Sequence, residues 1–114
     1  MEDCLFCKIA AGEIESEIVH EDELCIAFND TNPQAPVHFL IIPKKHIGSV
    51  AEITEADEGI LGHMLKTIAI LANDKGLNDK GYRVVSNVGK DGQQTIHHLH
   101  FHVIGGRSMQ WPPG

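Results

Sequence analysis

The stretch His97-His98-Leu99-His100-Phe101-His102-Val103 places three imidazoles at alternate positions in a run that is built like a β-strand. Because successive side chains of a strand point to opposite faces, we expect His98, His100 and His102 on one face. An imidazole titrates close to neutral pH, with an unperturbed pKa of roughly 6.5, so such a row can supply a nucleophile, a proton carrier or a metal ligand. The alternative is a half-buried edge strand with polar residues outside. The residues of the other face are apolar and predict a core: Leu99, Phe101 and Val103.

The length and charge of the chain limit what it can be. A chain of 114 residues fits one domain, over residues 1–114. Its formal net charge of −7 argues against a protein that follows a nucleic-acid backbone, which needs clustered Lys and Arg. The N-terminus lacks the basic and apolar regions of a signal peptide, and no apolar run approaches the roughly 18 residues that cross a bilayer. We therefore expect a soluble, cytoplasmic protein with neither a membrane nor a nucleic-acid polymer as partner.

The three cysteines are too few and too odd in number for a disulfide framework. Cys25 stands alone in an apolar segment and is expected to be a small buried residue. Cys4 and Cys7 form a C-x-x-C pair. From spacing alone this pair is equally well interpreted as a redox pair, half of a zinc site, or a coincidence.

The remaining pattern predicts an α+β fold. Thr54-x-x-Asp57 is typical of a capping box that opens a long helix, and Gly76 is a plausible end for it. Strand candidates are joined mostly by short turns, which favours an antiparallel sheet of about five strands with the long helix and a short N-terminal helix. The short helix is expected at about residues 5–11, before Gly12, and the strands at 18–20, 24–28, 38–43, 82–87 and 98–104.

Several segments together resemble one family. Residues 94–104, Gln-Thr-Ile-His-His-Leu-His-Phe-His-Val-Ile, resemble the His-φ-His-φ-His-φ-φ signature of the histidine-triad superfamily of nucleotide hydrolases and transferases. Residues 5–9, 27–30 and 36–46 resemble its Hint branch, and so does the ending at residues 105–114. The terminal Trp-Pro-Pro-Gly is the most branch-specific piece, and the resemblance covers nearly the whole chain.

The resemblance implies a purine nucleoside phosphoramidase that acts as a homodimer and needs no organic cofactor. Such an enzyme cleaves the P–N bond of a purine nucleoside phosphoramidate and releases an amine and the nucleoside monophosphate. His100 would attack phosphorus and carry the nucleotidyl group until water removes it, which divides one displacement into two easier steps. His98 and His102 would flank it, and His102 would donate to the phosphoryl oxygens.

Other roles follow from the resemblance by position. Asp30 would bind the ribose hydroxyls, although it is also a plausible turn residue before Pro33. His38 would stand behind the triad and fix the tautomer of a catalytic imidazole, or else be an ordinary core histidine. Trp111 is expected to reach the active site of the partner subunit. The walls of the base pocket would be Phe6, Ile9 and Phe28, for which core packing is nearly as good an interpretation, and the phosphate would lie near Asn87, Gln94 and Thr95.

The resemblance also bears on the C-x-x-C pair. Related branches have a C-x-x-C, a later His and the first triad His as zinc ligands, which correspond here to Cys4, Cys7, His46 and His98. Two thiolates and two imidazoles form the closed tetrahedral set of a structural zinc site. His97 could compete as the fourth ligand, but it is expected on the opposite face from His100.

Two other functional classes remain open on the sequence. A zinc hydrolase could use His98, His100 and a third His as metal ligands, with water as the nucleophile. Alternatively, the chain could bind a purine nucleotide without turning it over and act as a scaffold.

Overall fold

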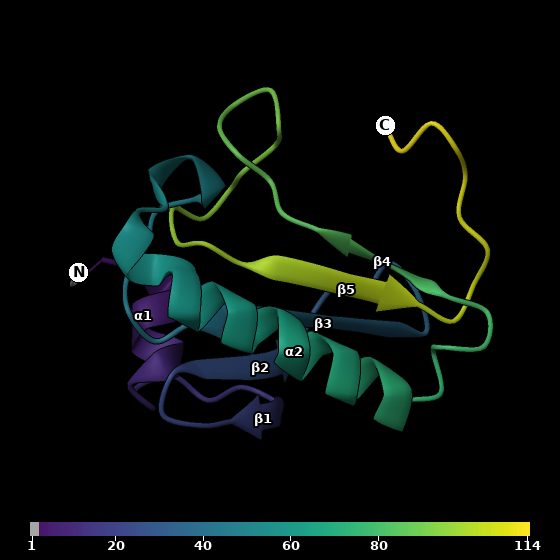
Figure 1. Cartoon of the computed structure of the whole chain (residues 1–114), viewed down its shortest axis with the longest axis horizontal. Helices are drawn as coiled ribbons and strands as arrows, with labels where there is room; N and C mark the ends of the chain where they lie inside the picture. Colours follow the sequence, from purple (N-terminus) through teal and green to yellow (C-terminus); the bar gives the residue numbers. More distant parts are fainter. Residues whose placement is uncertain (1–2) are drawn as a thin grey trace.

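The computed structural model describes residues 3–114 and is α+β, as predicted. Five antiparallel strands form one sheet in the order β1-β2-β3-β5-β4. Helix α2 crosses one face of this sheet, and the short helix α1 lies at the end of the sheet near the N-terminus (Figure 1). The elements are α1 (Leu5–Ala10), β1 (Ile18–Glu21), β2 (Cys25–Asn29), β3 (Val37–Pro43), α2 (Glu58–Asp74), β4 (Tyr82–Val85) and β5 (Phe101–Gly105), with two 3₁₀ turns at Val50–Glu52 and Glu55–Asp57.

The central strand β3 is apolar along nearly its whole length because both of its faces are covered. Phe39 and Ile41 belong to the larger core, which packs under α2. Leu40 and Ile42 alternate with them and belong to a smaller core that includes Phe6 of α1. Two cores of different size, one on each face, therefore explain why this run lacks the usual polar alternation.

Helix α2 begins where the sequence predicts it. The Asp57 carboxylate accepts a hydrogen bond of 3.0 Å from the Thr54 backbone N–H, as in a capping box, although one 3₁₀ turn precedes the α-helix itself. Gly76 follows the helix with a φ of +74°, a conformation that favours glycine. Leu65, which continues the helical apolar pattern, is nevertheless 50% exposed. Neither α2 nor any other helix in residues 3–114 is both long and apolar enough to cross a membrane.

The predicted strand at residues 98–104 is wrong at its start. The strand β5 begins only at Phe101, and β4 ends at Val85 rather than at residue 87. Before β5 the backbone turns, because the N–H of His98 donates to Ile96 O and the N–H of Leu99 donates to Ile47 O instead of to a neighbouring strand. This turn separates His98 from the pocket that His100 and His102 line.

Candidate functional site

A pocket of about 480 Å³ lies on the α1 side of the sheet, a size within the range of roughly 300–1,000 Å³ for small-molecule sites. Its walls are mostly apolar and come from α1, β2 and β3, with polar groups from the ends of β2 and from the segment before β5. The sequence-predicted residues that line it are Phe6, Ile9, Phe28, Asp30, Asn87, Thr95, His100 and His102.

The imidazole of His100 is held by the main chain two residues before it. Its Nδ1 lies 2.7 Å from the carbonyl oxygen of His98, so Nδ1 carries the proton and donates. No group among residues 3–114 bonds the other nitrogen, Nε2. Every fully buried side-chain nitrogen or oxygen in these residues has a hydrogen-bond partner, so the unpartnered Nε2 is not fully buried. Nε2 of His100 therefore presents an unprotonated lone pair that can be reached from the pocket.

A chain of two imidazoles sets the tautomer of His102. The backbone N–H of Gln34 donates to His38 Nδ1 at 3.0 Å, which leaves the proton of His38 on Nε2. This Nε2–H donates to His102 Nδ1 at 2.9 Å. The proton of neutral His102 is therefore on Nε2, where it is available to the pocket, and the ring lies beside His100 with a centroid separation of 5.1 Å.

Burial keeps His38 and His102 neutral by lowering their pKa values. Desolvation, with smaller contributions from the neighbouring imidazoles of His100 and His38, lowers the pKa of His102 to about 4. Desolvation also lowers the pKa of His38, although the Asp30 carboxylate opposes this effect. At neutral pH the pair therefore acts through neutral hydrogen bonds rather than through charge.

Asp30 lies at the end of β2, between the pocket and His38. One carboxylate oxygen, Oδ1, accepts from the Asn32 backbone N–H at 2.8 Å, which is the turn that the sequence suggested. The other, Oδ2, lies 3.4 Å from His38 Nε2. Asp30 thus combines the two expected interpretations, because it supports a turn and also faces the pocket.

The structure does not bring every predicted residue to the pocket. Gln94 braces the β4–β5 loop by donating to Gly48 O and Ile96 O at 2.8 and 3.0 Å, and its side chain does not line the pocket. The neighbouring Gln93 does line the pocket, with a φ of +62° that is uncommon outside glycine, and nothing in its side-chain type distinguishes it in the sequence.

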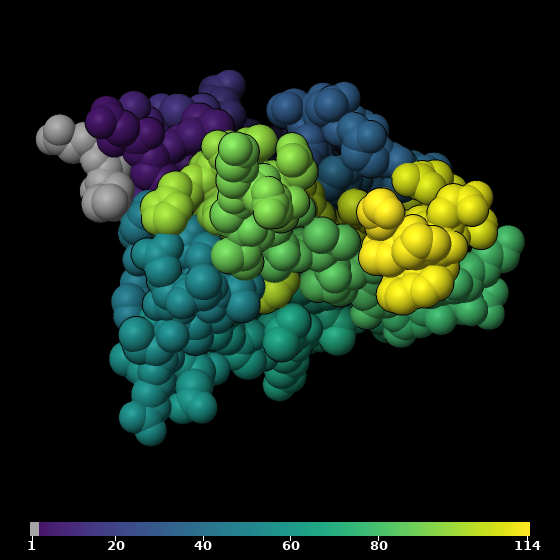
Figure 2. Space-filling model, turned by 90° about the horizontal axis from the view of Figure 1, so that it is seen from above, coloured from purple at the N-terminus to yellow at the C-terminus, as the bar shows by residue number. Residues whose placement is uncertain are grey.

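Trp111 also lies outside the pocket and is 80% exposed. Arg83 places the tail, because its guanidinium contacts Gln110 O and lies 5.9 Å from the Trp111 ring centroid. The tail lies across the molecule from the N-terminal segment, and the β4–β5 loop lies between the two (Figure 2). Trp111 thus lies at the surface and does not line the pocket of its own chain.

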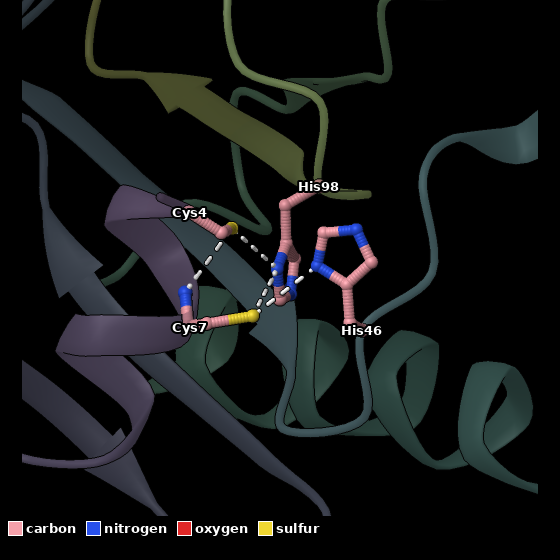
Figure 3. Close-up of side chains that lie close together, drawn as sticks. All are labelled: Cys4, Cys7, His46 and His98. Carbon is pink, nitrogen blue, oxygen red and sulfur yellow. Dashed lines mark hydrogen bonds between the residues drawn. The ribbon is translucent and has the colours of Figure 1, made fainter. Parts of the chain in front are cut away.

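The four sulfur and nitrogen ligands predicted for a metal do come together (Figure 3). Cys4 is the N-cap of α1, and its Sγ accepts from the Cys7 backbone N–H, so the C-x-x-C spacing follows one helical turn. Cys4 Sγ lies 3.3 Å from His98 Nδ1, and Cys7 Sγ lies 3.2 Å from His46 Nδ1. The four atoms lie within 4.8 Å of one another.

This donor set fits a zinc ion. Tetrahedral ligands at about 2.3 Å for sulfur and about 2.0–2.1 Å for nitrogen are roughly 3.5 Å apart, close to the separations above. His98 is also oriented for the task, because its Nε2–H donates to Pro43 O at 2.9 Å and leaves the Nδ1 lone pair facing the thiols. The competing ligand, His97, is absent from the cluster and instead pairs with Glu52 at 3.1 Å.

The same geometry weakens the alternative of a catalytic zinc between His98 and His100. His98 turns its free nitrogen to the cysteines, while the free nitrogen of His100 faces the pocket. Among residues 3–114, none of the convergent groups of metal-ligand atoms contains His100.

Comparison with known proteins identifies the family to which the chain belongs. Residues 3–111 match the family model described as "Scavenger mRNA decapping enzyme C-term binding". An uncharacterised HIT-like protein of Synechococcus elongatus is 51% identical over 99% of this chain and 98% of that relative.

Solved structures give the same result. A HIT family hydrolase from Legionella pneumophila superposes with a TM-score of 0.96 and 49% identity, covering 98% of this chain and all of the other (100%). A histidine triad nucleotide-binding protein from Candida albicans has a TM-score of 0.83 and 32% identity, over 96% of this chain and 83% of that one. By sequence, fold and the placement of its imidazoles, the chain belongs to the histidine-triad (HIT) superfamily.

Proposed function

We propose that this protein is a purine nucleoside phosphoramidase of the Hint branch, which cleaves the P–N bond of an adenosine- or guanosine-type phosphoramidate. The observation that carries the proposal is the free Nε2 of His100 at the pocket, with its Nδ1 proton held by the carbonyl of His98. A neutral imidazole with this lone pair can attack phosphorus directly. Kinship with a nucleotide-binding protein and with a HIT family hydrolase supports both the ligand and the reaction class.

The reaction would proceed in two displacements. His100 Nε2 forms a bond to phosphorus, the P–N bond to the amine breaks, and the leaving amine takes up a proton from solvent. As the His100 ring becomes cationic, its hydrogen bond from Nδ1–H to the His98 carbonyl strengthens. Water then attacks phosphorus and releases a proton to solvent, the electron pair of the P–Nε2 bond returns to Nε2, and the nucleoside monophosphate leaves with His100 neutral again.

The other pocket residues would bind and orient the substrate. The Nε2–H of His102 can donate to a phosphoryl oxygen, where negative charge develops. Asp30 can accept from the ribose hydroxyls, and the purine would lie against the edge-to-face pair of Phe6 and Phe28, whose centroids are 5.6 Å apart. Ile9 adds apolar surface to the pocket. Asn87 and Thr95 also line it, and their neutral side chains can donate hydrogen bonds to an anionic phosphate.

We further propose that Cys4, Cys7, His46 and His98 hold a structural zinc ion. When bound, this ion would tie α1 to the segment before β5, and it offers no open position for substrate. His98 connects this cluster to the pocket, because its ring faces the cysteines while its carbonyl holds His100. His98 is in this sense a positioning residue for the nucleophile.

The proposed reaction is tested by trapping the intermediate. Rapid quench of the protein with an adenosine phosphoramidate, followed by mass spectrometry, should show one adenylyl group on His100. His100→Asn should bind adenosine monophosphate yet lose turnover by orders of magnitude, because only the covalent step is removed. The matched control is His97→Asn, which alters an exposed imidazole three residues away. Turnover of His100→Asn within tenfold of the parent would contradict the role of His100.

A further inference from the structure

A second group of metal-ligand side chains lies on the opposite face of the sheet from the pocket. The β1–β2 hairpin supplies three of its members, His20, Asp22 and Cys25, whose ligand atoms converge. The fourth, His63 of α2, joins them through its contact with Asp22. In Figure 1, α2 crosses one face of the sheet to which β1 and β2 belong. The group shares no residue with the Cys4–Cys7–His46–His98 cluster.

Asp22 is the centre of this group, and its carboxylate is fixed by the main chain. Its Oδ1 accepts from the backbone N–H groups of Leu24 and Cys25, at 2.8 and 3.0 Å. These two bonds hold the hairpin turn and aim the second oxygen, Oδ2, toward α2. A carboxylate anchored through one oxygen in this way is prepared to offer the other as a ligand.

Two imidazoles converge on that oxygen. His20 Nε2 and His63 Nε2 each lie 2.7 Å from Asp22 Oδ2. At this distance from a carboxylate oxygen, each Nε2 carries the proton and donates it to Asp22. Neither Nδ1 bonds to another group within residues 3–114, so the proton can move to Nδ1 when an ion takes the place between Nε2 and the carboxylate. The two side chains remain 33% and 36% exposed, which leaves an ion a path from solvent.

The Sγ atom of Cys25 adds a fourth possible metal ligand, from the buried side of the group. Its side chain is fully buried, and its Sγ lies 3.6 Å from Asp22 Oδ2. Ligand atoms of His20, Asp22 and Cys25 all lie within 4.8 Å of one another. We propose that His20, Asp22, Cys25 and His63 form a second metal site, which takes a divalent late transition-metal ion such as Zn²⁺.

The chemistry of the donors fits such an ion better than Mg²⁺ or Ca²⁺, because two imidazoles and a sulfur are present and only one carboxylate. Nitrogen and oxygen ligands at about 2.0–2.1 Å in a tetrahedron stand about 3.3 Å apart. The imidazoles must therefore withdraw from Asp22 by about 0.6 Å, and His63, which lies outside the 4.8 Å cluster of the other three, must also turn toward them. His20 and His63 are partly exposed, so rotation of their side chains can do both. The thiol proton leaves to solvent when Cys25 joins the ion.

The site is tested by counting zinc. The full chain is dialysed against micromolar Zn²⁺, and the zinc bound per chain is measured by inductively coupled plasma mass spectrometry. His63→Gln should bind one zinc fewer than the parent, while its amide N–H can still donate to Asp22 and preserve the fold. His20→Gln should give the same loss. The control is His97→Gln, an exposed imidazole outside both clusters, which should bind as the parent does.

A second set of variants, made in a protein that lacks Cys4 and Cys7, measures zinc binding without the C-x-x-C cluster. Cys4→Ser with Cys7→Ser should retain one zinc, and adding His63→Gln should remove it. Because the comparison is a difference between variants, the result does not depend on whether the first cluster binds metal. Equal zinc in the parent and His63→Gln, with both folded by circular dichroism, would overturn the proposal and leave a hydrogen-bonded link between α2 and the hairpin.

Discussion

At the scale of single residues, the main chain decides what each imidazole does. The carbonyls of Pro43 and His98 take the N–H of His98 and His100, while the N–H of Gln34 takes the lone pair of His38. Each hydrogen bond fixes the protonation of one ring nitrogen and thereby decides whether the other nitrogen of the neutral ring donates or accepts. Three chemically identical side chains thereby become a proposed metal ligand, a proposed nucleophile and a donor to a third ring.

The relay from Gln34 to His102 gives the first prediction. His38→Ala should lower kcat by about 10–100-fold, the usual effect of losing a group that orients a functional side chain, because His102 is then free to place its proton on Nδ1. KM should change less. His38→Gln offers an amide N–H in place of Nε2–H and should restore part of kcat. Steady-state kinetics with an adenosine phosphoramidate measures this, and an unchanged kcat in His38→Ala would contradict the relay.

The residues that the sequence could predict were those whose type and spacing carry chemistry. The convergence of His100 and His102, and of the C-x-x-C pair with His46 and His98, was expected and is found in the structure. Gln93 and the meeting of Asp22 with His63 could not be predicted, because they depend on backbone conformation and on contacts 41 positions apart. A polar side chain in a turn or on a helix gives no sign of such a contact.

At the scale of elements, alternation of residue types did not predict where the last strand begins. The pattern of residues 98–104 satisfies a two-residue period, but a strand also needs a neighbour for its hydrogen bonds. The N–H of Leu99 donates to Ile47 O, so pairing starts only at Phe101. In contrast, the apolar strand β3, expected at residues 38–43 and found at Val37–Pro43, and the capping box before α2 rest on local sequence and were predicted correctly.

The link between α1 and the segment before β5 gives the second prediction. If Cys4, Cys7, His46 and His98 hold zinc, the binding energy of the metal is also folding energy. Cys4→Ser with Cys7→Ser should bind one zinc fewer and melt lower, at about 4–8 °C for each kcal/mol lost in a domain near this size. Phosphoramidase activity should persist, because His100 attacks without a metal.

Calorimetry and metal analysis of protein purified without chelator check this outcome. A redox pair predicts instead a metal-free parent in which oxidant forms a reversible Cys4–Cys7 disulfide. Metal-free protein with unchanged melting in the double variant would remove the structural site.

At the scale of the whole molecule, burial of His102 makes folding sensitive to acid. The pKa of His102 is lowered to about 4 in the folded state, against roughly 6.5 in an unfolded chain. The unfolded state therefore binds the proton first as the pH falls. The free energy of unfolding is therefore unaffected by His102 above about pH 6.5, and protonation of this residue in the unfolded state lowers it progressively toward pH 4.

This linkage gives the third prediction. Between pH 7 and pH 5 the free energy of unfolding should fall by on the order of 2 kcal/mol through His102 alone. His102→Gln has no such proton to bind and should lose less stability over the same range. Urea unfolding at the two pH values measures both proteins. An equal loss in the variant would show that His102 does not carry the effect.

The exposed tail gives the last prediction, which concerns assembly. Trp111 is 80% exposed and packs beside Arg83, so it presents a large amphipathic surface that suits an interface between two copies of the chain. Because the tail contributes little to its own core, deleting residues 111–114 should scarcely change the melting temperature. It should alter the ratio of kcat/KM for two amine leaving groups, since the tail would border the site of the partner subunit. Sedimentation should show a dimer for the full chain, and unchanged discrimination between the amines would contradict this placement.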